Sequence, residues 1–281
     1  MATIVSFHAH PDDEAIPTGG SLALASDAGH RVVIVFATRG EHGEVAEGFL
    51  EPGEELWQRR VQEVQRAAEL LGAHRVEFLG YTDSGMMGVP ENDAPQSFWQ
   101  ADVEEAARRL ASILSEERAE ILTIYDQNGG YGHPDHIQVH RVGTRAAELA
   151  GTQRVYEATI SRNHVQRMMA QARQEGIELP GDIESEDFDS LGVPEDQITT
   201  AVDVTGYLDR KRAAMAAHAS QISETSFFLA MQPEQFAQAF GTEWFIRQGD
   251  AGPGQMRGEM EDSLFDGMEE PSGTGSQPAD R

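Results

Sequence analysis

The sequence predicts an α/β protein whose mostly parallel sheet carries helices on both faces. Short apolar segments alternate with stretches of helical periodicity over roughly 160 residues, which is the pattern of consecutive βαβ units. The segment Arg31–Ala37 (RVVIVFA) is apolar at nearly every position, as in a strand buried on both faces of a parallel sheet. Right-handed crossovers bring the carboxyl ends of such strands to one edge, where α/β sheets bind ligands. We therefore expect the functional loops at that edge.

The expected strands are short and rich in apolar or β-branched residues. The first, Thr3–Phe7 (TIVSF), ends where a polar segment begins at His8. The others are expected at Arg31–Ala37, Val76–Leu79, Ile121–Tyr125, Val155–Ile160 and Thr199–Val204. Their order with the intervening helices predicts a Rossmann-like, doubly wound sheet.

The expected helices carry apolar side chains at three- and four-residue spacing. They are expected at Gly19–Ala28, Gly53–Leu71, Ala101–Glu117, His136–Leu149 and Tyr207–Gln221. Gly29 and Gly72 follow the first two of these helices and are typical C-terminal caps. The loops left at the carboxyl edge of the sheet are His8–Pro17, Thr38–Pro52, Gly80–Ser97 and Asp126–Asp135.

The chain is long enough to bury a sizeable core, and one domain is predicted over residues 1–247. Residues 248–281 are rich in Gly, Pro, Ser and acidic side chains, which predicts a flexible, disordered acidic tail. The segment Gln171–Asp196 is acidic and weakly periodic, so we expect an excursion over the surface that could act as a lid.

The composition is strongly acidic, with 48 Asp and Glu residues against 21 Lys and Arg and a formal net charge of −27. Such a charge repels nucleic acids and anionic membranes, so neither is expected as a partner. No apolar run approaches the roughly 20 residues that span a bilayer, and no basic leader precedes the first apolar segment. The chain has no cysteine, so a metal would have to bind His, Asp or Glu. These features favour a cytoplasmic protein.

Two short motifs follow the first and fourth expected strands. They are His10-Pro11-Asp12-Asp13-Glu14 and Tyr131-Gly132-His133-Pro134-Asp135-His136. Each proline restricts its own backbone and that of the preceding residue, which holds the flanking side chains at set angles. His10 and Asp13 can then reach one ion, with Asp12 free to accept a proton from water. A second imidazole would come from the other loop, as His133 or His136.

Structural explanations compete with this interpretation. A single His-Pro-Asp segment is most often a turn, and paired aspartates can cap a following helix. Two copies, each after an expected strand, favour a functional site. Other side chains near the motifs are expected to be structural, namely His8, Glu14, His140 and His218.

These motifs resemble the PIG-L (LmbE-like) zinc-dependent deacetylases, and most closely their mycothiol-type deacetylase and amidase branch. The similarity covers roughly residues 2–222. Weaker matches are the segments 38–41 with 43–44, 60–63, 83–86 and 217–221. Only the two His-Pro-Asp motifs are highly specific.

The resemblance implies a role for each matching position. His10, Asp13 and His136 would bind Zn²⁺, with Fe²⁺ as the alternative metal. Asp12 would be the general base. His133 would be a second acid–base or electrostatic residue, oriented by the carboxylate of Asp135. Tyr131 would polarise the acyl carbonyl. Arg60 and Asp83 would hold sugar hydroxyls, and Glu44 and Met86 would line the site.

The resemblance implies an N-acyl hydrolase, with N-acetyl as the expected acyl group and a small glucosamine-type glycoside as the substrate. One alternative is cleavage of a larger amide, as in a mycothiol S-conjugate amidase. Another is a non-enzymatic ligand-binding α/β module, although no Gly-x-Gly-x-x-Gly loop follows the first strand. A homo-oligomer remains open at this point.

Overall fold

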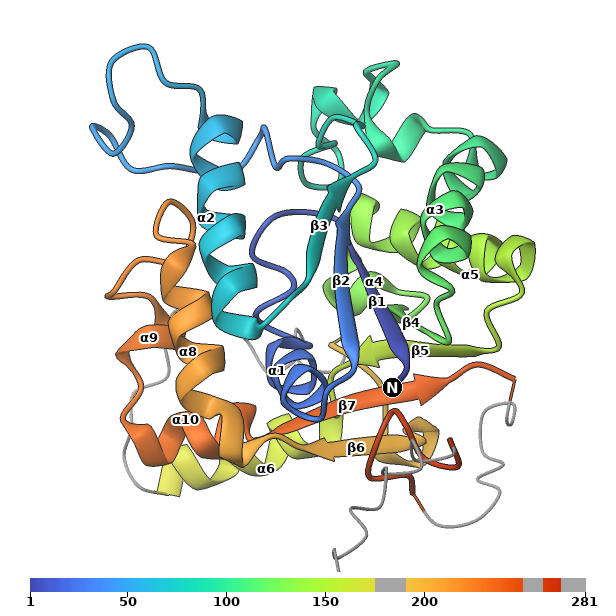
Figure 1. Cartoon of the computed structure of the whole chain (residues 1–281). Coiled ribbons are helices and arrows are strands. Elements are labelled where there is room, and N and C mark those ends of the chain that lie inside the picture. The colour runs from blue at the N-terminus through green and yellow to red at the C-terminus, as the bar shows by residue number, and fades with distance from the viewer. Residues whose placement is uncertain (175–190, 250–259, 269–281) are drawn as a thin grey trace, which may run out of the picture.

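A single mixed sheet forms the centre of the molecule in the computed structural model, which describes residues 1–174, 191–249 and 260–268. Among these residues the sheet has seven strands in the order β3-β2-β1-β4-β5-β7-β6 (Figure 1). Their bounds are β1 Thr3–His8, β2 Arg31–Phe36, β3 Arg75–Phe78, β4 Ile121–Tyr125, β5 Arg154–Thr159, β6 Thr200–Asp203 and β7 Thr242–Arg247. The first five are parallel, while β7 runs antiparallel to both β5 and β6.

Helices cover both faces of the parallel part of the sheet (Figure 1). One face carries α1 (Gly19–Asp27), α2 (Leu56–Leu71) and α8 (Leu208–Ala217), which contact one another. The other carries α3 (Val103–Glu117) and α5 (Pro134–Ala150). The helices α4 (Gly129–Gly132), α6 (Arg162–Gln174), α9 (Phe227–Ala230) and α10 (Pro233–Phe240) and four short 3₁₀ turns complete the described elements.

Alternating side chains of the central strands fill two separate cores. Val32, Ile34 and Phe36 of β2 belong to the core beneath α1, α2 and α8. Val33 and Val35 of the same strand belong to the core beneath α3 and α5. Burial on both faces explains why β2 is apolar at nearly every position, and the predicted fold class is confirmed.

The buried carboxylate of Glu243, in β7, joins this strand to α1 and α8. Glu243 of β7 accepts hydrogen bonds from the backbone N–H groups of Gly20 and Ser21, at 2.7 and 2.8 Å. The ammonium of Lys211, from α8, lies 2.5 Å from the same carboxylate. Glu243 therefore caps α1 from a distant part of the chain, in place of a local capping side chain.

The structure differs from the sequence-based prediction mainly in the second half of the chain. All six expected strands and five expected helices are present, with ends shifted by a few residues. The expectation missed β7, which is inserted between β5 and β6 and makes that edge antiparallel. It also missed α6, α9, α10 and the short α4. In the described part of the chain, no helix combines the length and apolarity required to cross a membrane.

Two predicted segments fall partly outside the described residues. Most of the expected lid, Gln171–Asp196, lies there (residues 175–190), as do residues 250–259 and 269–281 of the expected tail. Residues 260–268, within the expected tail, pack against the domain, which the tail prediction did not anticipate. Leu264 is only 2% exposed, and the ring of Phe265 stacks on His30 with centroids 3.9 Å apart. The domain boundary at residue 247 stays a prediction.

Candidate active site and metal centre

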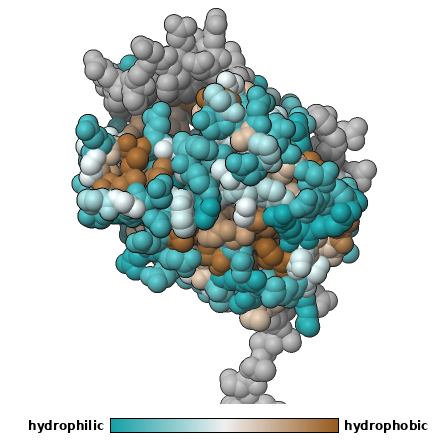
Figure 2. All heavy atoms as spheres, turned by 90° about the horizontal axis from the view of Figure 1, so that it is seen from above, coloured by the Kyte–Doolittle hydropathy of each residue, from teal (hydrophilic) through white to brown (hydrophobic). Residues whose placement is uncertain are grey.

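The two His-Pro-Asp motifs meet at the carboxyl edge of the sheet, because β1 and β4 are neighbouring parallel strands. The first loop (residues 9–18) connects β1 to α1, and the second loop (residues 126–133) connects β4 to α5. Figure 2 looks down on this edge from above, where hydrophobic patches interrupt a largely hydrophilic surface. Exposed apolar side chains from segments that follow the strands are Val45, Met86, Met87 and Tyr131.

The first loop makes a tight turn that places two carboxylates next to one imidazole. The backbone N–H of His10 donates to Asp13 Oδ2 (2.8 Å), and the N–H of Asp13 donates to the His10 carbonyl (3.3 Å). Between them, Asp12 has a φ of 111°, and its N–H donates to Glu14 Oε2 (3.0 Å). A residue with a Cβ rarely adopts such a backbone angle, and backbone strain of this kind concentrates at functional sites.

The second loop is shaped by a buried carboxylate and by glycine. Asp126 Oδ1 accepts the N–H groups of Asn128 and Gly130, at 2.9 and 3.0 Å. Gly129 has a φ of 64°, and a Cβ at this position would lie 2.6 Å from the Cβ of His136. The absence of a side chain therefore lets the loop pass close to His136. The same loop presents Tyr131, which is 54% exposed.

Three imidazoles and the Asp13 carboxylate converge between the two loops. His10 Nδ1 lies 3.4 Å from Asp13 Oδ2, and His136 Nε2 lies 3.3 Å from Asp13 Oδ1. His10, His133 and His136 each offer a ring nitrogen within 4.8 Å of the others. The structure thus brings together all three predicted metal-binding side chains.

The converging atoms fit a cation. His136 Nε2 is buried and has no hydrogen-bond partner among the described residues. An unpaired polar atom in a buried position is costly unless something else satisfies it. Two imidazole nitrogens and one carboxylate are also a common catalytic zinc set, which leaves one position open. The donor set therefore fits Zn²⁺, and Fe²⁺ accepts the same donors.

The Asp135 carboxylate was expected to orient His133, and the structure places it elsewhere. Asp135 Oδ2 lies 3.1 Å from His10 Nε2 and accepts the N–H of Ser84 at 2.9 Å. Only the backbone of Asp135 reaches His133, with its N–H donating to Nδ1 (3.1 Å). Asp135 lies in the first turn of α5, and its side chain reaches His10 of the other loop. Asp135 therefore holds His10, together with Asp83, whose Oδ1 lies 3.5 Å from the same Nε2.

Asp12 faces the buried guanidinium of Arg60 and lies next to the carboxylate of Asp13. Burial raises the pKa of Asp12 to about 6, Asp13 adds to the shift, and the Arg60 guanidinium opposes it. Arg60 Nη2 lies 3.3 Å from Asp12 Oδ2. The Arg60 guanidinium also donates to the carbonyls of Gly40 and Pro11. Arg60 was expected to hold sugar hydroxyls, but it is buried and its Nη1 and Nη2 groups contact protein.

His133 is set up as a neutral ring. Burial lowers the pKa of His133 to about 4, and His10 and His136 add to this effect. Nδ1 accepts the Asp135 N–H, so the proton of the neutral ring is on Nε2. The Nε2–H group is then free to donate.

The other expected substrate-binding side chains differ in their accessibility. Asp83 is buried, and its carboxylate accepts the N–H groups of His42 and Gly85, at 3.1 and 2.8 Å. These bonds show a role in shaping the site that the sequence did not indicate. Glu44 is exposed, and Met86 is 54% exposed. Only these last two are directly available to a ligand from solvent.

One neighbour of the site, Tyr125, was not predicted from the sequence. The Tyr125 ring stacks on His136 with centroids 4.5 Å apart, and its hydroxyl lies 2.9 Å from His8 Nδ1. Burial lowers the pKa of His8 to about 4, so the ring is a neutral hydrogen-bonding group, as its expected structural role requires. Tyr125 stands at the end of an expected strand, and only that position hinted that it would lie beside the second motif.

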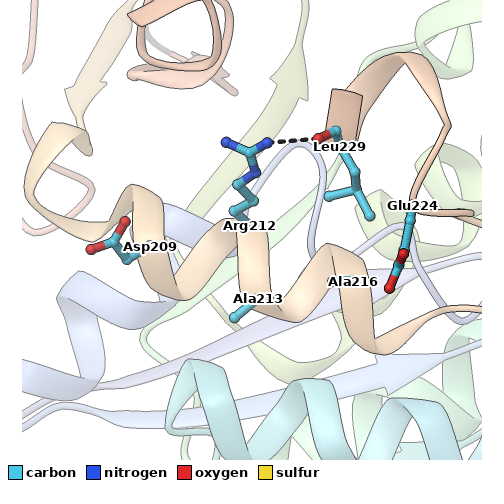
Figure 3. A pocket seen from close by; sticks show the side chains of 6 residues that line it. All are labelled: Asp209, Arg212, Ala213, Ala216, Glu224 and Leu229. Carbon is cyan, nitrogen blue, oxygen red and sulfur yellow. Dashed lines mark hydrogen bonds between the residues drawn. The ribbon is translucent and has the colours of Figure 1, made fainter. Parts of the chain in front are cut away.

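A surface cavity of about 330 Å³ lies elsewhere, between α8 and α9. Its walls are Asp209, Arg212, Ala213, Ala216, Glu224 and Leu229 (Figure 3). Arg212 crosses it to donate to the Leu229 carbonyl at 2.6 Å. None of the predicted site residues lines this cavity.

Comparison with known proteins agrees with this geometry. The family model described as "PIG-L: GlcNAc-PI de-N-acetylase" matches residues 5–147, which include both motifs. A 1D-myo-inositol 2-acetamido-2-deoxy-alpha-D-glucopyranoside deacetylase from Thermomonospora curvata is 40% identical over 94% of this chain and 96% of its own length. A protein of the same name from Acidothermus cellulolyticus is 39% identical over 96% of each chain.

Solved structures show the same fold at lower identity. The N,N'-diacetylchitobiose deacetylase of Pyrococcus horikoshii superposes with a TM-score of 0.57 at 23% identity, covering 90% of this chain and 84% of that one. The deacetylase of the A40926 pseudoaglycone gives a TM-score of 0.58 at 18% identity, covering 89% and 98%. At these identities the likeness concerns the fold.

Proposed function

Because this chain belongs to the PIG-L family of de-N-acetylases, we propose that it is a zinc-dependent hydrolase that removes the N-acetyl group from a glucosamine unit of a small glycoside. The observation that carries the proposal is the convergence of His10, Asp13 and His136 beside the separate carboxylate of Asp12. This arrangement offers a metal position and a proton acceptor side by side.

In this proposal His10, Asp13 and His136 would hold the metal. Asp135 and Asp83 engage the opposite nitrogen of His10 and fix the orientation of its ring. Zinc bound by these residues would supply Lewis acidity, which would lower the pKa of water toward about 7 and polarise a carbonyl. Fe²⁺ is the alternative metal.

Asp12 is the general base of the proposed reaction. Its carboxylate takes a proton from the attacking water and then returns it to the leaving amine. A pKa of about 6 suits both steps, because the group is ionised near neutrality and still a competent acid once protonated. Arg60 keeps the carboxylate in place from α2.

His133 and Tyr131 stabilise the charge that develops on the amide oxygen. The neutral His133 ring donates from Nε2, since Nδ1 is already bonded to the Asp135 backbone. Tyr131 lies at the exposed side of the site, with its ring 5.0 Å from that of His136. We assign His133 as an electrostatic donor and Asp12 as the proton carrier.

The first candidate substrate is the acetamido-glucopyranoside of myo-inositol that gives the relatives their name. It is uncharged, so the acidic character of the chain does not oppose its approach. The proposal keeps the sequence-based expectation of a small-molecule substrate in the cytoplasm.

A substrate screen tests the proposal. Zinc-loaded protein is incubated with this glycoside, with N-acetylglucosamine and with bulkier N-acyl analogues that model a conjugate amidase, and released amine is measured. We expect release from the acetylated glycoside and loss of that release after chelation, with recovery on adding zinc. Release from bulky amides alone would reassign the enzyme to the amidase alternative. A zinc-replete protein that hydrolyses none of them would overturn the proposal.

A further inference from the structure

The strained backbone of Asp12 is held by the side chain of Glu14. Asp12 has a φ of 111°, which an unrestrained residue with a Cβ would leave for the α or β region. Its N–H donates to Glu14 Oε2 at 3.0 Å, and its carbonyl accepts the N–H of Ala15 at 3.1 Å. Glu14 is therefore the side chain that secures the Asp12 amide.

Glu14 is itself secured from the far end of the chain. Its side chain is fully buried, and a buried carboxylate requires a hydrogen-bonded or charged partner. His218, which directly follows α8, places Nε2 at 2.5 Å from Glu14 Oε1 and is also fully buried. The two carboxylate oxygens thus link His218 to the backbone of Asp12.

His218 lies in an anchored turn and directs one ring nitrogen toward Glu14. Its Nδ1 is buried and has no hydrogen-bond partner among the described residues. The turn that carries it is anchored, because Ser220 donates through its N–H (2.8 Å) and hydroxyl (2.6 Å) to Glu63 of α2. The His218 carbonyl also accepts the N–H of Ile222 at 2.8 Å. The anchored turn therefore presents His218 Nε2 to Glu14.

We propose that His218 is a positioning residue for Asp12 and acts through Glu14. The inference rests on the proposed function, since it assumes that Asp12 carries the proton. Arg60 meets the Asp12 carboxylate from α2 at 3.3 Å. Glu14 holds the backbone of the same residue, and His218, just after α8, holds Glu14. Losing the second constraint lets Asp12 relax to an ordinary backbone angle and turns its carboxylate away from the reacting water.

Kinetics of three variants test the role. His218→Ala should lower kcat by about 100-fold, the scale of a misplacement near 1 Å, while KM and zinc affinity stay unchanged. His218→Gln, whose amide can still donate to Glu14, should recover most of the rate. His30→Gln is the matched control, because His30 stacks on Phe265 outside the site. An unchanged kcat in a folded His218→Ala protein would overturn the proposal, as would a parallel loss of zinc affinity.

A second measurement does not depend on activity. Amide hydrogen exchange in the zinc-free protein should quicken in the peptide covering residues 9–16 for His218→Ala, and not for His30→Gln. Unaltered exchange there contradicts the positioning role even if the enzyme deacetylates its substrate. Faster exchange supports it even if no substrate is found, so the two proposals fail separately. Should His218→Ala not fold, Glu14→Gln takes its place in both measurements, since it weakens the same link from the other side.

Discussion

Two neighbouring carboxylates in the first loop have opposite environments. The Asp13 side chain is 13% exposed, and His136 and His10 face it and hold the pKa of its carboxyl well below the usual range. Asp12, at its unusual φ of 111°, contacts Arg60 instead, and burial raises its pKa to about 6. Environments that separate two titratable groups in this way assign them different tasks.

This separation predicts that substitutions in the two loops fail differently. Asp12→Asn should keep zinc and lower kcat by about 10³-fold, because it removes only the proton acceptor. His136→Ala should lower zinc affinity by more than about 100-fold, since removing an outer partner of a ligand already costs up to that much. Metal analysis of the purified variants, followed by zinc titration, distinguishes the two effects. Equal metal loss in both variants would argue against Asp12 as a separate base.

The sequence allowed correct placement of these side chains but not all of their contacts. Two His-Pro-Asp motifs after parallel neighbouring strands were sufficient to bring His10, Asp13 and His136 together. Spacing along the chain could not show which ring the Asp135 carboxylate faces. Its partner, His10, comes from the other loop, and that pairing depends on where α5 begins.

At the scale of elements, an ionic cluster ties α3 to the sheet at the edge opposite the site. Glu117, the last residue of α3, contacts Arg31 at the start of β2 (2.5 Å) and Arg75 at the start of β3 (2.7 Å). Its side chain is 7% exposed. Hydrogen bonds from Arg31, followed by those from Arg75, lower the pKa of Glu117 to about 2 against partial burial.

Glu117→Gln should therefore destabilise the fold by about 1 kcal/mol at neutral pH. A lowered folded-state pKa means that the unfolded chain binds more protons below pH 4.5, so this contribution is complete above pH 4.5 and is lost as the pH falls through 2. Thermal unfolding of both proteins between pH 7 and pH 3 measures the difference. Glu116→Gln, at a 63% exposed side chain, is the control. A difference that does not shrink on acidification would contradict the assignment.

Element prediction succeeded where the pattern was local and failed where pairing was tertiary. The apolar runs of β1, β2 and β4 were sufficient to predict these strands. The six residues of β7 (TEWFIR) mix polar and apolar side chains and become a strand by pairing with β5 and β6. Nothing within the segment specifies those partners, so its place in the sheet could not be predicted.

At the scale of the whole molecule, residues 260–268 fasten the antiparallel edge of the sheet. Glu261 forms an ion pair with Arg247 of β7 (2.6 Å) and accepts the Thr200 hydroxyl of β6 (2.9 Å). Leu264 is nearly fully buried against the same region. The predicted acidic tail thus contains a segment that contributes to the fold, which its composition concealed because one buried leucine is a weak signal.

Truncation after residue 249 should lower the free energy of unfolding by about 2 kcal/mol, the value of burying one leucine side chain. Truncation after residue 268 keeps the packed segment and serves as the control. Both proteins should retain kcat at temperatures where they are folded, because the site lies at the carboxyl ends of β1 and β4. Denaturant titration gives the stabilities; equal stabilities for the two truncations would show that the segment contributes nothing.

The hydrogen bonds around the first loop also fix an order of events during synthesis. The first loop is synthesised early. However, Glu14 cannot contact His218, and Glu243 cannot cap the N-terminus of α1, until those later residues have been synthesised. On the ribosome, the first motif emerges long before either partner exists. The nascent chain must therefore have reached residue 243 before this loop can acquire its final set of contacts, and a product terminated before that point would carry the motif without the support that shapes it.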